Sequence, residues 1–282
     1  MRSNKTNMTR RILVENEIES SLSGLKERVA IIMPVYNEVD TIESTIRELY
    51  DKVANKMDNM DIWAFEDGST DGTKGVLEKL ENEFPNFHAK MAKGKKGYPK
   101  AMREAFLSID PNEYEYVVAI DSDGQYDPDD FFKLWSIMQR DSPNIVMGRR
   151  VTRREPLYRK FLSQGLQVLE RLMFPVSCKD VTSVMRLMRV EVAHHIAKEV
   201  CYSKYNFWLE FTARMSLSGY KIVEIPIAYR ERVGGSKVYS IAKMPRVILS
   251  EFSALRAVKR EKMETERACQ KRSSLRKSRQ IS

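Results

Sequence analysis

Acidic side chains follow three of the short apolar runs in this sequence. In an open sheet of parallel strands, the carboxyl ends of the strands form the edge where ligands bind. Two carboxylates one residue apart at such an end can both reach one hard divalent cation that also takes phosphate oxygens. The pattern therefore predicts a site for a cation and a phosphate-bearing ligand. The three acidic groups are Glu38, then Glu66 with Asp67, then Asp121 with Asp123.

The elements that must position these side chains follow from the periodicity of the chain. Apolar runs alternate with segments of helical spacing, which is typical of a mostly parallel sheet flanked by helices, an α/β fold. We expect strands at 29–35, 61–65, 116–120, 144–148 and 220–225, and helices beginning near 42, 73, 101, 128, 161 and 238. The segment 149–160 is expected to be a basic loop.

Charge is unevenly distributed along the 282 residues. Residues 1–28 hold six bases and four acids, residues 259–282 hold nine bases and three acids, and the rest is near neutral. A neutral body argues against a nucleic-acid groove in the fold. Basic ends suit contact with an anionic surface such as lipid headgroups.

The cysteines and the hydropathy restrict the cellular setting. Cys178, Cys201 and Cys269 have no CxxC spacing, which argues against a disulfide framework or a zinc site and favours a reducing compartment. The longest apolar stretch, Val29 to Tyr36, is far shorter than the roughly 18 residues of a spanning helix. We expect a soluble or peripheral protein on the cytoplasmic side of a membrane.

Longer motifs surround the acidic groups. The strings PVYNE at 34–38, DGSTDGT at 67–73 and DSDGQ at 121–125 resemble the signature of inverting family 2 glycosyltransferases, which have the A-type (GT-A, Rossmann-like) nucleotide-sugar fold. Further strings at 159–163, 180–183 and 232–237 resemble the polyprenyl-phosphate branch, typified by dolichyl-phosphate mannosyltransferase. Glu66 stands where that signature usually has aspartate. The Gln-x-x-Arg-Trp motif of processive polysaccharide synthases is absent.

The resemblance implies roles on the donor side. The nucleoside would be held by Pro34, Tyr36, Glu38 and Asp67, with Asp121 also on the nucleotide. A Mg²⁺ or Mn²⁺ ion on the diphosphate would be held by Asp121, Asp123 and Gln125, and would neutralise the leaving group. Arg232, Ser236 and Lys237 would close over the donor diphosphate, although Arg230 is a second candidate for the arginine. Glu38 could instead be an acid at a helix N-terminus.

On the acceptor side, the resemblance implies that Arg150, Arg159 and Ser163 bind a lipid phosphate. A sugar hydroxyl acceptor would need a carboxylate base, whereas a lipid phosphate is already anionic. Asp180 is the one candidate base, and it could equally orient an arginine or cap a loop. Catalysis would then depend on Asp123, Asp180 and Arg232.

The leading hypothesis is a metal-dependent, inverting transferase. It would move one sugar from GDP-mannose or a UDP-sugar to a dolichyl or undecaprenyl phosphate. One alternative keeps the donor but uses a hydroxyl acceptor with Asp180 as base, and another is a non-catalytic nucleotide-sugar-binding subunit.

The same reading divides the chain into four parts. These are a basic extension at 1–28, a catalytic domain at 29–237, an amphipathic helix at 238–258 and a disordered basic tail at 259–282. The amphipathic helix could close the core or lie on a membrane. The anchor to the membrane would be the tail or a membrane-embedded subunit.

Overall fold

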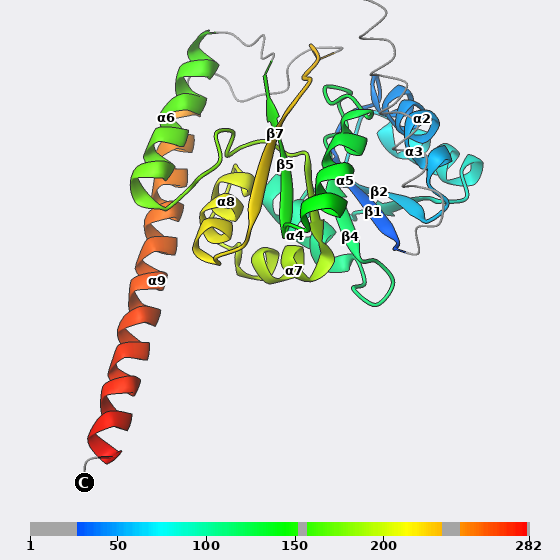
Figure 1. Cartoon of the computed structure of the whole chain (residues 1–282). Coiled ribbons are helices and arrows are strands. Elements are labelled where there is room, and N and C mark those ends of the chain that lie inside the picture. Colours follow the sequence, from blue (N-terminus) through cyan, green and yellow to red (C-terminus); the bar gives the residue numbers. More distant parts are fainter. Residues whose placement is uncertain (1–26, 152–156, 233–242, 281–282) are drawn as a thin grey trace, which may run out of the picture.

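A mostly parallel sheet forms the centre of the molecule (Figure 1). The computed structural model describes residues 27–151, 157–232 and 243–280, without the side chains of 157–163 and 269–280. In these residues the sheet order is β3-β2-β1-β4-β6-β5-β7, and β6 alone runs antiparallel to its neighbours. The expected fold class is confirmed. The strands are β1 Val29–Val35, β2 Met60–Glu66, β3 Phe87–Met91, β4 Tyr116–Ala119, β5 Ile145–Arg150, β6 Arg186–Arg189 and β7 Ile222–Ile227.

Helices cover both faces of this sheet. α4 packs against α7 and α8, and α2 packs against α3. α5 packs on β5 and β6. The helices are α2 Ile42–Lys52, α3 Thr73–Glu83, α4 Tyr98–Ser108, α5 Asp130–Asp141, α6 Leu157–Met173, α7 Val190–Glu199, α8 Phe207–Leu217 and α9 Met244–Gln280, with a short 3₁₀ helix η1 at Ala54–Lys56.

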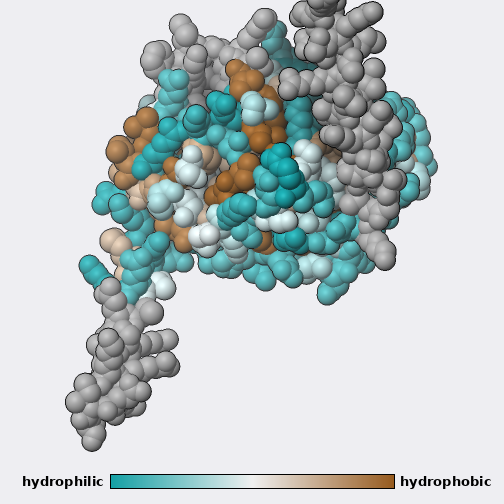
Figure 2. All heavy atoms as spheres, in the orientation of Figure 1, coloured by the Kyte–Doolittle hydropathy of each residue, from teal (hydrophilic) through white to brown (hydrophobic). Residues whose placement is uncertain are grey.

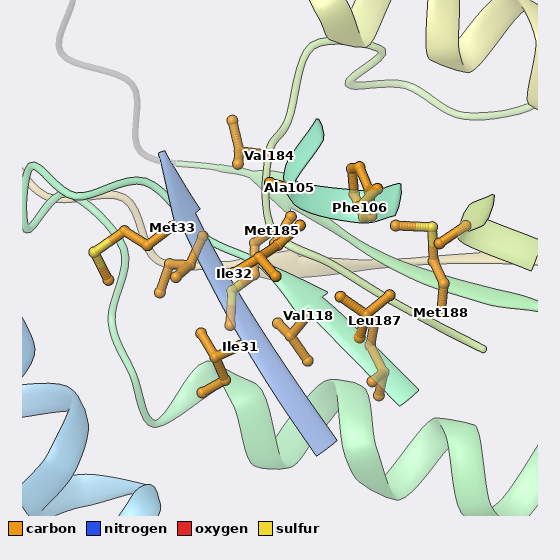
Figure 3. Packing of buried hydrophobic residues seen from close by; sticks show 14 of the residues in the cluster. Ile31, Ile32, Met33, Ala105, Phe106, Val118, Val184, Met185, Leu187 and Met188 are labelled. Atoms are coloured by element: carbon orange, nitrogen blue, oxygen red, sulfur yellow. The ribbon is translucent and has the colours of Figure 1, made fainter. Parts of the chain in front are cut away.

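The core holds the central strands rigidly, and their ends carry the acidic groups. Every residue of β1 is buried, as expected for a parallel strand covered on both faces. Figure 3 shows Ile32 of β1 beside Val118 of β4 and Leu187 of β6, with Phe106 of α4 above them. Because these side chains are closely packed, the carboxyl ends of β1, β2 and β4 are fixed relative to one another.

The C-terminal helix differs from the sequence expectation. We expected a helix to end at 258 and a disordered tail to follow, but α9 continues to Gln280, a length of about 55 Å. After Pro245 the segment contains no glycine or proline and is rich in helix-forming residues. Leu255 and Val258 are buried, and α9 packs against α8, so this part of the helix closes the core. The C-terminal end of α9 extends away from the rest of the molecule (Figure 1).

The expected basic loop at 149–160 is also shorter than predicted. Arg149 and Arg150 continue β5, and α6 already begins at Leu157. The backbone pairing of β5 with β7 extends to Arg150, which lies opposite Ile227. Both arginines therefore lie at the carboxyl end of β5. The strand therefore positions Arg150 directly at the ligand edge of the sheet.

Candidate active site

Two loops at the carboxyl ends of β1 and β2 are locked together. Asn37 has a positive φ of 54°, a conformation that asparagine tolerates, and its Oδ1 accepts a hydrogen bond from the Thr70 N–H at 2.8 Å. Its own N–H donates to Ser69 Oγ at 2.9 Å, and the N–H of Glu38 donates to Thr73 Oγ1 at 2.9 Å. The residues on either side of Asn37 are thereby held in fixed positions.

Glu66 lies inside the second of these loops. One oxygen of its buried carboxylate accepts the N–H of Ser69, and the other lies 3.7 Å from Lys74 Nζ. The longer side chain at this departure from the family signature therefore closes the turn that precedes α3.

Asp67 holds a third, basic segment over the same edge. Its two oxygens accept the N–H groups of Lys96 at 2.7 Å and Gly97 at 2.9 Å, just before α4. A Cβ at Gly68, where φ is +76°, would lie 2.5 Å from the Lys95 nitrogen, so this close approach requires glycine. Lys95 Nζ in turn lies 3.6 Å from the centroid of the Tyr36 ring. Asp67 therefore places a cationic loop beside the residues predicted to hold the nucleoside.

The Asp121 and Asp123 pair follows β4. Ser122 Oγ donates to the carbonyl oxygen of Pro34 at 2.8 Å, which fixes the pair against β1. Burial, together with the Asp123 carboxylate, raises the pKa of Asp121 to about 8, and burial also raises the pKa of Asp123. Two crowded carboxylates with raised pKa values form an environment that a divalent cation would stabilise.

The acidic side chains at this edge fit a metal ion that is also coordinated by a substrate. In the part of the chain that the structure describes, no three His, Cys, Asp or Glu side chains gather into a complete metal centre. A cation on a diphosphate, however, takes much of its coordination from phosphate and water. Gln125 is not placed for this role, because its amide accepts a hydrogen bond from the Tyr229 hydroxyl at 2.9 Å and donates to the Arg230 carbonyl at 3.2 Å. Asp121 and Asp123 thus remain the metal ligands that we propose.

Arg232 lies between the acidic groups. Its Nη2 contacts the two carboxylate oxygens of Glu38 at 2.5 and 2.7 Å, and its Nη1 is 3.4 Å from Asp123 Oδ2. Arg230 instead pairs with Glu48 of α2 at 2.8 Å and with Asp127 at 3.0 Å, and it does not contact Glu38 or Asp123 in the described interactions. Of the two candidate arginines, the structure thus brings Arg232 to the site, and the Glu38 carboxylate faces Arg232.

Arg150 and Asp180 form a buried, bidentate ion pair. Nε and Nη2 of Arg150 donate to the two carboxylate oxygens at 2.8 Å each, and the side chains are only 7% and 6% exposed. Arg150 Nη2 also donates to Thr182 Oγ1 at 2.9 Å, and its guanidinium lies 5.2 Å from the centroid of the Tyr229 ring. The Asp180 carboxylate therefore orients an arginine, and its placement does not favour the role of general base.

Two residues of this arrangement were not identified from the sequence. Glu224 accepts the N–H groups of Lys179 and Asp180 at 2.8 Å each, which holds the loop before β6. Tyr229 contacts both Arg150 and Gln125. The sequence signal for Glu224 was its position as a charged residue within the apolar strand expected at 220–225.

The remaining predicted residues are only partly described. Arg159 and Ser163 belong to α6, but their side chains lie outside the described set, and Ser236 and Lys237 lie outside the described residues altogether. The structure does bring together residues from six separate parts of the chain at one edge of the sheet. These are Pro34, Tyr36 and Glu38, then Asp67, then Asp121 and Asp123, then Arg150 with Asp180, and Arg232.

Comparison with known proteins identifies this arrangement. The glycosyl transferase family 2 model matches residues 30–197, which include both the β1 and β4 acidic groups and the Arg150–Asp180 pair. The chain belongs to glycosyl transferase family 2. The family predicted from the motifs is confirmed, as is the class of enzyme, a hexosyltransferase.

Two curated relatives cover most of this family 2 chain. The undecaprenyl-phosphate mannosyltransferase of Micrococcus luteus is 29% identical over 217 residues, which is 75% of this chain and 87% of that protein. The polyprenol monophosphomannose synthase of Mycolicibacterium smegmatis is 27% identical over 219 residues, covering 75% and 81%.

A solved structure shares the fold of this family 2 enzyme. Glucosyl-3-phosphoglycerate synthase from Mycobacterium tuberculosis, in complex with Mn²⁺, uridine diphosphate and phosphoglyceric acid, matches with a TM-score of 0.61. The match covers 85% of this chain and 82% of that one at 17% sequence identity. It confirms the expected A-type fold.

Proposed function

We propose that this enzyme transfers a single mannose, with inversion, from a nucleotide diphosphate sugar to a polyprenyl phosphate. The observation that carries the proposal is the buried Arg150–Asp180 pair. An acceptor hydroxyl would need a base, but Asp180, the carboxylate considered for that role, is held by an arginine. A phosphate acceptor brings its own charge and needs an oriented guanidinium instead. The names of the two curated relatives support mannose and a polyprenyl phosphate.

The donor would bind across the ends of β1, β2 and β4. Pro34, Tyr36 and Asp67 would contact the nucleoside of GDP-mannose, with a UDP-sugar as the other donor. Asp121 and Asp123 would hold a Mg²⁺ or Mn²⁺ ion, which neutralises negative charge on the departing diphosphate. Arg232, with Ser236 and Lys237, would bind the diphosphate from the C-terminal side. Together these side chains would orient the donor for attack by the acceptor phosphate.

The acceptor phosphate would bind to Arg150, Arg159 and Ser163. Replacement of Arg159 by alanine should raise the KM for a short polyprenyl phosphate at least about tenfold, because a charged hydrogen bond contributes on the order of 1.5–3 kcal/mol. The KM for the nucleotide sugar should change far less. Steady-state kinetics with both substrates varied would measure the difference, and Arg140→Ala, an exposed arginine in the last turn of α5, is the matched control. An equal loss for both substrates would contradict the assignment.

A lipid acceptor requires contact with a bilayer. No helix in the described ranges 27–151, 157–232 and 243–280 has the length and hydropathy of a membrane span. The helix α6 exposes Val168 and Leu172, and apolar residues gather on this side of the molecule (Figure 2). The neighbouring α9 carries five bases and no acid beyond residue 267. We therefore propose a peripheral enzyme on the cytoplasmic face of the membrane, held by α9 or by a membrane-embedded subunit.

Binding to vesicles tests this attachment. Each base near an anionic surface contributes on the order of 1 kcal/mol, so the protein should sediment with phosphatidylglycerol vesicles at low salt and dissociate at high salt. Glutamine in place of the five distal bases should remove most of the binding without shortening the helix. Salt-insensitive binding, or binding unchanged by these substitutions, would show that another part of the protein is the anchor. The five bases are Lys271, Arg272, Arg276, Lys277 and Arg279.

A further inference from the structure

The guanidinium of Arg232 contacts a carboxylate that we also propose as a ligand of the metal ion. It contacts both oxygens of Glu38 and lies 3.4 Å from Asp123 Oδ2. The Asp123 side chain is 11% exposed and that of Arg232 is 20% exposed, so water screens the contact only partly. Arg232 therefore supplies positive charge to the same carboxylate that we propose as a metal ligand.

The backbone around Arg232 limits how this side chain can move. The N–H of Arg230 donates to the carbonyl of Gln125 at 2.7 Å, and Tyr126 and Tyr229 form a β-bridge. The chain two residues before Arg232 is thus fixed to the loop that carries Asp123.

We propose that Arg232 is a resident counter-ion that competes with the divalent cation for Asp123. Glu38 is then a positioning residue for this arginine. A cation that binds Asp123 displaces Nη1, and the released end of the guanidinium becomes available to the donor diphosphate. The arginine fork suits both partners, because it binds carboxylate and phosphate with the same geometry. This inference rests on the metal site of the proposed function.

The exchange makes binding of metal and donor cooperative. Metal alone must remove Arg232 from Asp123 and leave part of the guanidinium without a counter-ion. When a nucleoside diphosphate is present, its phosphates replace that counter-ion. Each ligand should therefore increase the affinity for the other, as linkage requires.

The test is Mn²⁺ binding measured by electron paramagnetic resonance of the unbound ion, first without nucleotide. Arg232→Gln should bind Mn²⁺ about tenfold more tightly than the wild type, within the usual range of coupling between ligands. Arg230→Gln removes an equal charge two residues away and should leave the affinity unchanged. Arg232→Lys keeps the charge but cannot span both carboxylates, so its affinity should lie between those of the wild type and Arg232→Gln. With GDP added, the wild type should gain Mn²⁺ affinity and Arg232→Gln should gain much less.

The other outcomes are decisive. Equal Mn²⁺ affinity of the wild type and Arg232→Gln without nucleotide would overturn the exchange. An equal increase in Mn²⁺ affinity in Arg232→Gln and Arg230→Gln would also overturn it, because such an increase would reflect net charge alone. In either case, loss of Mn²⁺ binding in Asp123→Asn would still support the proposed metal site. Absence of Mn²⁺ binding in every variant, with and without GDP, would instead overturn the metal site itself.

Discussion

Asp123→Asn should lower the turnover of this enzyme by at least about a hundredfold, the effect of removing one group that stabilises charge in a transition state. Asparagine keeps the size of the side chain and an oxygen for the N–H of Gln125, which donates to Asp123 Oδ1 at 3.2 Å. It loses the charge that a divalent cation would need. Arg232 retains its contact with Glu38, so the fold should persist.

Turnover at saturating donor, together with thermal unfolding, would measure this effect. Asp129→Asn is the matched control, because Asp129 is an exposed acid of the same loop that pairs with Lys52 on the surface. The control should keep wild-type turnover. Full activity of the wild type in excess chelator, or normal turnover of Asp123→Asn, would contradict the metal assignment.

Asp180→Asn should both destabilise the protein and weaken acceptor binding. Removal of one partner from a buried ion pair costs on the order of 3–5 kcal/mol, and here it leaves the Arg150 guanidinium buried without its counter-charge. The free energy of unfolding in urea should fall by about that amount. The KM for polyprenyl phosphate should rise, because Arg150 is no longer held in place.

The pH profile separates this positioning role from general-base catalysis. If Asp180 only orients Arg150, the kcat of Asp180→Asn at saturating acceptor should keep the pH dependence of the wild type. If Asp180 is the base, kcat should fall at every acceptor concentration and recover as the pH rises. Thr182→Val removes the 2.9 Å hydrogen bond from Arg150 and the longer 3.5 Å hydrogen bond to Asp180, and it should fold even if Asp180→Asn does not.

The strands and the acidic edge were predictable because their signals are local. A buried parallel strand reads as a continuous apolar run, and β1 and α3 have the expected bounds. β6 gave no such signal, because it reads RLMR and its Arg186 is fully buried. That guanidinium donates to the carbonyls of Val181 and Ser183 and lies over Trp208. Only the tertiary structure supplies those partners.

The side-chain partners in the site were less predictable than its location. The pair between Glu38 and Arg232 joins residues 194 positions apart, and no periodicity connects them. Asp180 was open to two interpretations until the fold placed it on Arg150. α8 was missed for a related reason, since a helix that is buried on nearly all sides shows no amphipathic pattern.

The acceptor is the central claim, and the product of a competition assay tests it most directly. The enzyme would receive labelled GDP-mannose, a divalent cation, a short polyprenyl phosphate and an excess of free mannosides that offer hydroxyl groups. We expect the label in a lipid-soluble, acid-labile mannosyl phosphate of inverted configuration, and none in a longer glycan. Label on a sugar hydroxyl, with the polyprenyl phosphate unchanged, would contradict the proposal and assign the enzyme to hydroxyl acceptors.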